Sequence, residues 1–424
     1  MLKRIDAADV QLGMFIHKLE GSWFKHPFWK SRFLLDDEDT LQSLRGSDVT
    51  GIVIDTAKGA DVLPARPRAG RNGKGAAPLA RPAGRAMRAM PGGRPPFDLR
   101  STARAGMARE FGHAGTIADR GRKLVGQVFL EMRLGKSIKT RNVEPVIEEI
   151  FASVQRNPHA FNGLMRCKRD NEYIYRHAIA MSALMISLAR TMKFSPEQIR
   201  IAGMAGLLMD VGIGHLPVDL TQLGGDYRNL DPAILEQHVP LGHEFLRAGG
   251  GIPDEVLAVA RNHHERIDGT GYPRGVKGPE IDTLSRMAAI CDFYDSLVSD
   301  TAEGTGMNPA SALQQMAVMT GWFDRAILKS FIETMGMHPI GSVVRLCSGR
   351  LAMVVDQDPA DCSRPRVRCF YSTRSGRFVQ PTDIELAHCY GEDEIEAVAD
   401  PADYGIDDFA KLREHLFAAA AKAA

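Results

Sequence analysis

The sequence predicts a multi-domain, mainly α-helical protein, and three observations support this fold class. Apolar residues recur with a helical period through the middle of the chain. Short apolar runs separated by turn residues occupy both ends, as in small sheets. A stretch rich in proline, glycine, alanine and arginine, without hydrophobic period, lies between the first end and the middle. We therefore expect a small α+β domain (1–60), a basic linker (61–110), a helical domain (111–337), a small antiparallel β appendage (338–395) and a helical tail (396–424).

Composition is that of a globular protein: 44% of the 424 residues are hydrophobic and 25% are charged. The net charge of +1 indicates no general preference for nucleic acid or anionic membrane. The six cysteines form no Cys-x-x-Cys pair, so neither a disulfide framework nor a zinc ribbon is indicated. We find no apolar run of about 18 residues and no signal peptide pattern, and expect a cytoplasmic protein without a transmembrane segment.

The linker concentrates the positive charge. Between Arg66 and Arg109 there are eleven basic residues and one acidic residue, Asp98, so the segment carries +10. It is either a solvated spacer or a basic arm for lipid or nucleic acid. Phe97 is its only aromatic residue able to stack on a base, so we favour the spacer and expect no specific nucleic acid partner. We also expect proteases to cut within residues 66–105 first.

Elements on either side of the linker can be placed from local signals. Strand runs occupy 10–17, 23–28 and 51–55, and two helical patterns fill 118–155. Ser195 to Gln198 has the pattern of a capping box, which predicts a helix that ends near Asp210. A further helix is expected to start after Asp231 and to carry His238 two turns later.

The most informative stretch is 263–273, with the sequence HHERIDGTGYP. Adjacent imidazoles lie about 100° apart on a helix, so His263 and His264 suit two neighbouring metal ions, or one ion and a phosphate. The two glycines permit backbone conformations that other residues avoid, and Pro273 restricts the exit of the turn. Alone, such a pair is more often two unrelated surface or core histidines than a metal site.

Further polar residues face the expected core on neighbouring helices. Singly, each is more often a hydrogen-bonded core residue than a ligand. Together with the histidine pair they supply four imidazoles and two carboxylates, a mixture suited to iron, manganese or zinc, in which a carboxylate can bridge two ions. We therefore predict a metal site. Its candidate ligands are His177, Asp210, His238, His263, His264 and Asp292.

The motifs, in this order, resemble the HD-GYP family of cyclic di-GMP phosphodiesterases. The matching stretches span about residues 160 to 335, and HHERIDGTGYP is the most specific of them. The N-terminal stretches GMFIHKL, SWFKHPFW and GIVIDT are similar to a domain of unknown function that often precedes HD-GYP domains. The other matching stretches are EYIYRH (172–177), LLMDVG (207–212), HVPLG (238–242) and ICDFYD (290–295).

The resemblance implies an HD-type helical bundle with two divalent metal ions, iron or manganese being expected. A hydroxide between the ions would attack a phosphorus of cyclic di-GMP and release a linear dinucleotide or GMP. His177, Asp210 and Asp292 would hold one ion, and Asp210, His238, His263 and His264 the other. Asp210, as the shared ligand, is the catalytic candidate, and Gly271, Tyr272 and Asp295 are the substrate-binding candidates.

Three positions depart from the family pattern. Met209 stands where the family has the histidine of a His-Asp doublet, Ile213 where many members have a lysine, and residues 301–306 (TAEGTG) where an Arg-Pro-Tyr-Arg run is usual. These departures leave a second interpretation open, a non-catalytic effector or scaffold that binds cyclic di-GMP or a signalling protein, with a homodimer as a further expectation. A hydrolase for another nucleotide is the third.

Overall fold

The computed structural model describes residues 2–20, 33–36, 38–45, 51–60, 105–167, 173–219, 226–301, 304–358, 361–389 and 393–423. The predicted strand at 23–28 and nearly all of the linker, with its predicted protease sites, lie outside these ranges. The chain divides into two units, Met1–Asp98 and Leu99–Ala424, which we describe separately.

The first unit contains an antiparallel sheet with the strand order β1-β4-β2-β3. Its core alternates along the strands, as in Ile52 and Ile54, because successive side chains of a strand point to opposite faces. The run predicted at 51–55 coincides with β4, whereas the run predicted at 10–17 overlaps β2 only at 15–17. The elements are β1 (Leu2–Ile5), β2 (Phe15–Glu20), β3 (Phe33–Leu34), α1 (Glu38–Arg45) and β4 (Gly51–Asp55).

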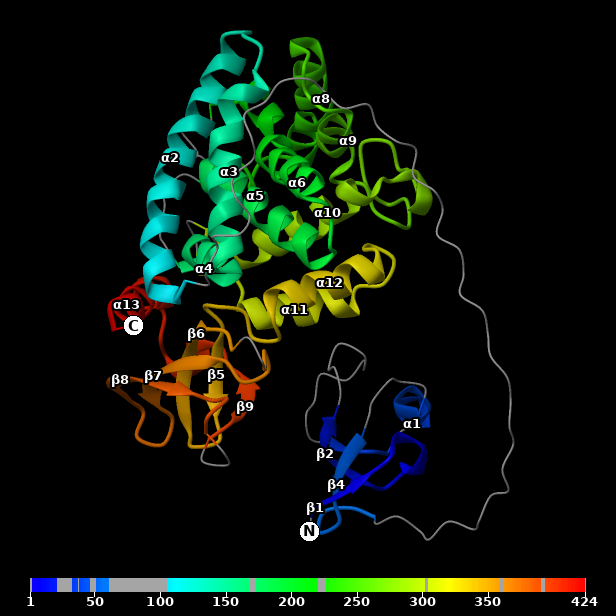
Figure 1. The fold of residues 1–424 in the computed structure, drawn as a ribbon, viewed down its shortest axis with the longest axis vertical. Coiled ribbons are helices and arrows are strands. Elements are labelled where there is room, and N and C mark those ends of the chain that lie inside the picture. Colours follow the sequence, from blue (N-terminus) through cyan, green and yellow to red (C-terminus); the bar gives the residue numbers. More distant parts are fainter. Residues whose placement is uncertain are drawn as a thin grey trace. The chain divides into compact units, whose positions relative to one another are not determined.

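The second unit begins with a helical bundle (Figure 1). Helix α5 is its centre, since sixteen of its nineteen residues are buried. Within the described ranges, no helix has both the length and the apolar character needed to cross a membrane. The helices are α2 (Met107–Arg133), α3 (Thr140–Arg156), α4 (Pro158–Cys167), α5 (Tyr173–Thr191), α6 (Pro196–Leu208), η3 (Val211–His215), α7 (Pro232–Leu235), α8 (His238–Gly249), α9 (Asp254–Asn262), α10 (Thr283–Val298), α11 (Pro309–Val318) and α12 (Arg325–Met335).

Helix α6 starts as the sequence predicts. The Ser195 hydroxyl accepts a hydrogen bond from the Gln198 amide, and the Gln198 side chain accepts one from the Ser195 amide. The prediction of one continuous helix from Asp231 to beyond His238 is wrong. Helix α7 ends at Leu235 and α8 begins at His238, because Pro240 has no amide hydrogen and its ring excludes the carbonyl four residues earlier.

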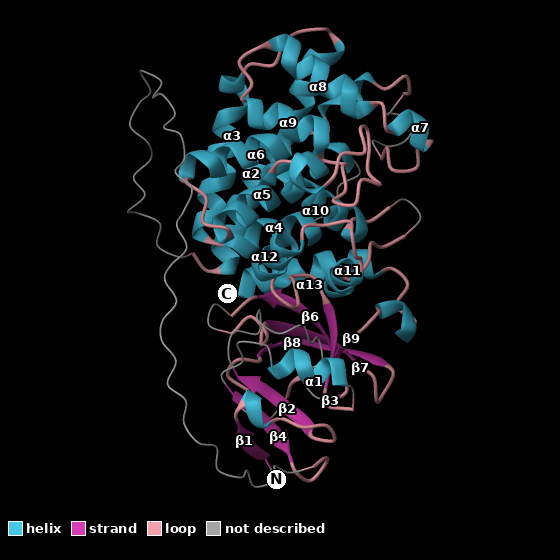
Figure 2. Cartoon of the chain, turned by 90° about the vertical axis from the view of Figure 1, so that its right-hand side faces the viewer, coloured by secondary structure: helices cyan, strands magenta, loops and turns pink. Residues whose placement is uncertain are grey.

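A five-stranded antiparallel sheet and a final helix complete the second unit (Figure 2). The sheet residues share one hydrophobic core with Ala160 and Cys167 of α4 and with Leu416 and Phe417 of the final helix. The last helix is therefore packed against both the bundle and the sheet. The elements are β5 (Val343–Leu346), β6 (Arg350–Asp356), β7 (Arg366–Ser372), β8 (Arg377–Glu385), β9 (Ile395–Val398) and α13 (Phe409–Ala423), in the order β8-β7-β6-β5-β9.

Candidate metal centre

The six candidate ligands come from five helices or helix ends and converge inside the bundle. Helix α5 contributes His177, and the residue between α6 and η3 is Asp210. The first residue of α8 is His238, the residues that follow α9 are His263 and His264, and α10 contributes Asp292. Apart from the adjacent His263 and His264, the candidate ligands lie far apart in the sequence, so the fold itself builds the cluster.

The ligand atoms form two groups that share Asp210. The four-ligand group is Asp210, His238, His263 and His264, and the three-ligand group is His177, Asp210 and Asp292; within each, the ligand atoms lie within 4.8 Å of one another. Asp210 Oδ1 lies 3.3 Å from both His238 Nε2 and His263 Nε2, whereas its Oδ2 lies 3.0 Å from His177 Nε2. The two carboxylate oxygens thus face different groups, as a bridging ligand requires.

Three imidazoles are oriented by their Nδ1 atoms. His263 Nδ1 lies 3.1 Å from the Val259 carbonyl, and His238 Nδ1 contacts the Leu235 carbonyl. His177 Nδ1 lies 2.8 Å from Asp295 Oδ2. Carbonyl and carboxylate oxygens only accept hydrogen bonds, so each Nδ1 carries the proton and each Nε2 presents its lone pair to the interior.

This arrangement fits metal ions better than it fits internal hydrogen bonds. The Nε2 atoms of His238 and His263 lie 3.3 Å apart, and with both protons on Nδ1 there is no hydrogen to place between them. Among the described residues, buried His177 Nε2 has no partner with hydrogen-bond geometry, although oxygens of Asp210 and Asp292 lie within 3.3 Å. A divalent cation in each group would satisfy these lone pairs and carboxylates.

The electrostatics favour the ligand forms of Asp210 and His264. Burial would raise the pKa of Asp210, but contacts with His177, His238 and His263 hold that pKa well below its usual value. Burial, reinforced by the neighbouring imidazoles of His263 and His238, lowers the pKa of His264 well below its usual value. A carboxylate and a neutral imidazole are the forms that bind a metal ion. Burial lowers the pKa of His177 and His263, but neighbouring groups, chiefly Tyr173 and carboxylates for His177 and Asp210 for His263, raise that pKa overall, so a metal ion would displace a proton from these two imidazoles.

A close backbone contact sets the distance between two ligand-bearing elements. A Cβ atom on Gly212 would lie 1.9 Å from the His238 carbonyl oxygen, so η3 and α8 can approach this closely only with glycine there. That approach brings Asp210, two residues before Gly212, beside His238. The glycine is therefore part of the construction of the four-ligand group.

The turn after the histidine pair is folded back on it. The buried Glu265 carboxylate accepts hydrogen bonds from the amides of Arg274 (2.9 Å) and Val276 (3.2 Å). The Tyr272 ring stacks on His264, with centroids 4.6 Å apart and planes at 22°. A Cβ atom on Gly271 would lie 2.4 Å from the His264 carbonyl oxygen, which excludes other residues there. Tyr272, a predicted substrate-binding residue, thus lies directly beside a ligand.

Asp295, the third predicted substrate-binding residue, lies on the Nδ1 side of His177, away from the nitrogen that faces Asp210. That it contacts substrate stays a prediction; in the structure it orients His177. Tyr173, for which no role was predicted, also contacts His177. Its hydroxyl lies 3.2 Å from His177 Nδ1, and its ring stacks on the imidazole. Its spacing of four residues from His177, about one helical turn, was the available signal.

Comparisons with known proteins agree with this geometry. The HD domain family matches residues 155–327, which include all six ligands, and the Domain of unknown function (DUF3391) matches residues 2–143. Cyclic di-GMP phosphodiesterase PA4108 of Pseudomonas aeruginosa is 37% identical over 396 residues, which cover 93% of this chain and 91% of that protein. The chain belongs to the HD-GYP family.

Two other HD-GYP comparisons are more distant. 3'3'-cGAMP-specific phosphodiesterase 1 of Vibrio cholerae is 30% identical over 177 residues, 42% of this chain and 37% of that protein. The structure of Bd1817, a HDG"Y"P protein from Bdellovibrio bacteriovorus, aligns with 15% identity and a TM-score of 0.44, over 78% of this chain and 99% of that one.

The structure locates two of the departures from the HD-GYP pattern. Met209 is fully buried at the end of α6, next to Asp210, and Ile213 is fully buried in η3. The three-ligand group contains one imidazole fewer than the family doublet would supply. Of the third departure, the structure describes 301 and 304–306 only.

Proposed function

We propose that this protein is a metal-dependent phosphodiesterase that hydrolyses cyclic di-GMP in bacterial second-messenger signalling. The observation that carries the proposal is the orientation of Asp210, whose two oxygens face the Nε2 atoms of two separate ligand groups. The relative from Pseudomonas aeruginosa, named a cyclic di-GMP phosphodiesterase, supports the choice of substrate.

The residues present suit two divalent ions, and we propose iron or manganese. Imidazole and carboxylate donors match both metals, and Asp210 supplies an oxygen to each group. Bound ions of this kind polarise a phosphoryl oxygen and activate water as a nucleophile at neutral pH.

The protein's own residues have binding and positioning roles in this proposal. Asp210, as the shared carboxylate, fixes the separation of the two groups and is the residue we place at the reacting atoms. Tyr272 stacks on His264, and we place a guanine base of the substrate near this ring, while Gly271 permits the close backbone contact with His264 that holds the turn. Asp295 and Tyr173 keep the His177 ring in place.

The test combines metal analysis with turnover. The full chain is purified under low oxygen, its iron and manganese content is measured by mass spectrometry, and cyclic di-GMP hydrolysis is followed by chromatography with each metal added. We expect up to two ions per chain and metal-dependent formation of a linear dinucleotide or GMP. Tight cyclic di-GMP binding without turnover at any metal concentration would exclude the proposed activity.

A second candidate follows from Met209. We propose, as the alternative, a non-catalytic effector that retains the four-ligand group and binds cyclic di-GMP or a signalling partner, as a homodimer or with another protein. The three-ligand group supports this alternative, because two-metal catalysis needs both ions. Binding without hydrolysis in the experiment above is the outcome expected of this effector.

A further inference from the structure

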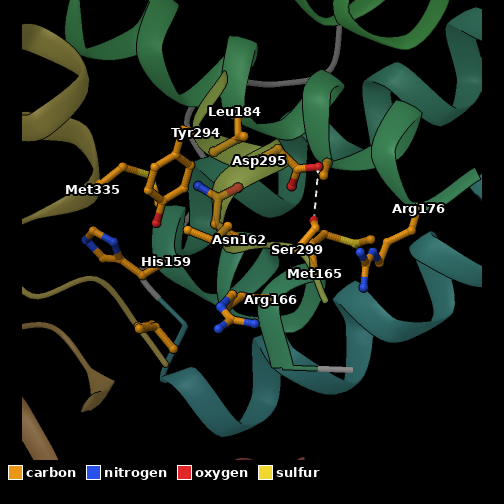
Figure 3. Close-up of a pocket in the computed structure, with 14 residues that line it drawn as sticks. His159, Asn162, Met165, Arg166, Arg176, Leu184, Tyr294, Asp295, Ser299 and Met335 are labelled. Carbon is orange, nitrogen blue, oxygen red and sulfur yellow. Dashed lines mark hydrogen bonds between the residues drawn. The ribbon is translucent and has the colours of Figure 1, made fainter. Parts of the chain in front are cut away.

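A pocket in the bundle lies apart from the six candidate ligands but is lined by one residue that contacts His177. Helices α4, α5, α10 and α12 contribute to its walls, and none of the six candidate ligands lines it (Figure 3). This residue is Asp295, which accepts a hydrogen bond from Ser299 within the pocket wall and contacts His177 outside it. The polar residues that line the pocket include Asn162, Arg166, Arg176, Asp295 and Ser299.

Arg176 is a buried cation that has no hydrogen-bonding partner in the described part of the chain. Its exposed fraction is 7%, and it makes no hydrogen bond or salt bridge with any residue that the structure describes; its guanidinium lies 5.6 Å from the centroid of the Tyr173 ring. The nearby carboxylates are engaged elsewhere, Asp295 by His177 and Asp226 by Arg228 at 2.6 and 2.9 Å. Burying a guanidinium in this way is unfavourable unless an anion completes the site.

Arg166 contributes a second under-used cation to the same pocket. Its side chain is 8% exposed, and among the described residues its buried Nε has no partner. Its hydrogen bonds to Asp300 (3.4 Å) and to the Met307 carbonyl (3.5 Å) are both long, and fully buried Arg413 also pairs with the Asp300 carboxylate. Two arginines therefore share one acid. Although burial lowers the pKa of Arg166 to about 10, the side chain remains charged at neutral pH.

We propose that this pocket binds the phosphate group of a small anionic ligand, with Arg166 and Arg176 as its cationic donors. The planar guanidinium presents paired N–H donors whose spacing matches two phosphate oxygens. Asp295 separates the bound anion from His177, so the site adjoins the three-ligand group without using its ligands. The inference stands on the pocket alone and does not depend on hydrolysis of cyclic di-GMP.

Isothermal titration calorimetry of the metal-loaded full chain tests the proposal, with inorganic phosphate in one arm and GMP in the other. Arg176→Gln is the test variant, because Arg176 makes no hydrogen bond with a described residue whose loss would disturb the fold. Arg325→Gln is the matched control: Arg325 is exposed at the start of α12, ten residues and about 15 Å from Met335, which lines the pocket. Asp210→Asn removes the shared metal ligand and reports phosphate bound at the metal centre.

We expect Arg176→Gln to weaken phosphate binding by at least about 10-fold, the usual loss for a charge-assisted hydrogen bond, while Arg325→Gln and Asp210→Asn retain it. Binding of GMP with the same dependence on Arg176 would identify a phosphomonoester as the occupant, and binding of inorganic phosphate alone would identify the free ion. Phosphate binding that survives Arg176→Gln but is lost in Asp210→Asn would place the anion at the metal centre and overturn the proposal. Competition by saturating cyclic di-GMP would also overturn it, since the pocket would then belong to the substrate site.

Thermal unfolding gives an independent readout. If Arg176 is held for ligand binding, Arg176→Gln without phosphate melts no lower than the wild type, and added phosphate raises the melting temperature of the wild type only. An equal decrease in melting temperature for Arg176→Gln with and without phosphate would show that the arginine has a purely structural role, contrary to the proposal.

Discussion

The four-ligand and three-ligand groups share one carboxylate but differ in composition. The four-ligand group combines Asp210 with three imidazoles, whereas the three-ligand group has one imidazole and two carboxylates. The difference arises at Met209, because a thioether is a poor ligand for iron(II) or manganese(II). In the proposed two-metal site, one group is therefore weakened while the other keeps its full ligand set.

The two groups also differ in how their imidazoles are held. In the four-ligand group, main-chain carbonyls of Leu235 and Val259 orient His238 and His263, and a substitution cannot remove them. In the three-ligand group, the side chains of Asp295 and Tyr173 orient His177. Among the described residues of the four-ligand group, only His264 has a side-chain support, the stacked Tyr272 ring, whereas the single imidazole of the three-ligand group depends on side chains alone.

The largest effect is expected from the residue that both groups share. Asp210→Asn should lower metal affinity and hydrolysis by roughly 100 to 10,000-fold. Losing one interaction that supports a ligand typically lowers metal affinity by about 10 to 100-fold, and here both groups lose a ligand. Metal content and chromatographic assay of hydrolysis measure this. Asp407→Asn, at an exposed loop position, is the control and should match the wild type. A variant that kept both ions would show that Asp210 does not bridge the groups.

The sequence was sufficient to choose six candidate ligands that the structure brings together, and that they bind metal stays a prediction. It could not reveal which nitrogen of each imidazole faces the interior, since this depends on Val259 and Leu235 carbonyls placed by the helices. Asp295 was predicted at the site, but its contact with His177 spans 118 positions and follows only from the packing of α5 against α10. The segment boundaries at 60, 110, 337 and 395 remain predictions.

The α13 helix is a second case in which the sequence predicts the element but not its tertiary contacts. The sequence predicts a helical tail, and helix formation there is a local property. Its attachment depends on Arg413, which is fully buried and pairs with Asp300, 113 positions earlier. Neither residue has a local pattern that identifies the other as its partner.

Loss of one imidazole from the complete group should come next in size. His238→Ala should lower the affinity for the tighter-bound ion by about 100-fold, and hydrolysis should fall with it. Losing a metal ligand should lower metal affinity at least as much as losing a hydrogen bond that orients a ligand. Metal titration of the variant should then show two weak ions in place of one tight and one weak. His388→Ala, exposed beyond β8, is the control. Unchanged tight binding would mean that the four-ligand group is not the stronger site.

Restoring the missing imidazole should make the two groups alike. Met209→His should raise affinity at the three-ligand group by about 10 to 100-fold, or roughly 1.4 to 2.8 kcal/mol, since it adds a ligand nitrogen beside Asp210. Equilibrium dialysis with iron or manganese measures the change, and hydrolysis should increase if the absent basic contacts are not limiting. Met209→Leu fills the buried position without a ligand and should leave affinity unchanged. Equal occupancy in all three proteins, with no hydrolysis, would favour the effector.

The smallest effect is expected from the support of His177. Asp295→Asn keeps an oxygen that can accept the His177 Nδ1–H but removes its charge, which makes the imidazole a weaker donor to metal. Affinity should fall by about 10-fold at the three-ligand group and stay unchanged at the four-ligand group, none of whose imidazoles depends on Asp295. Ser299→Ala removes the other hydrogen bond to Asp295 and should have less effect, because the carboxylate stays in contact with His177. Equal losses at both groups in Asp295→Asn would mean that Asp295 acts on the fold of the whole centre and that the two groups are not supported independently.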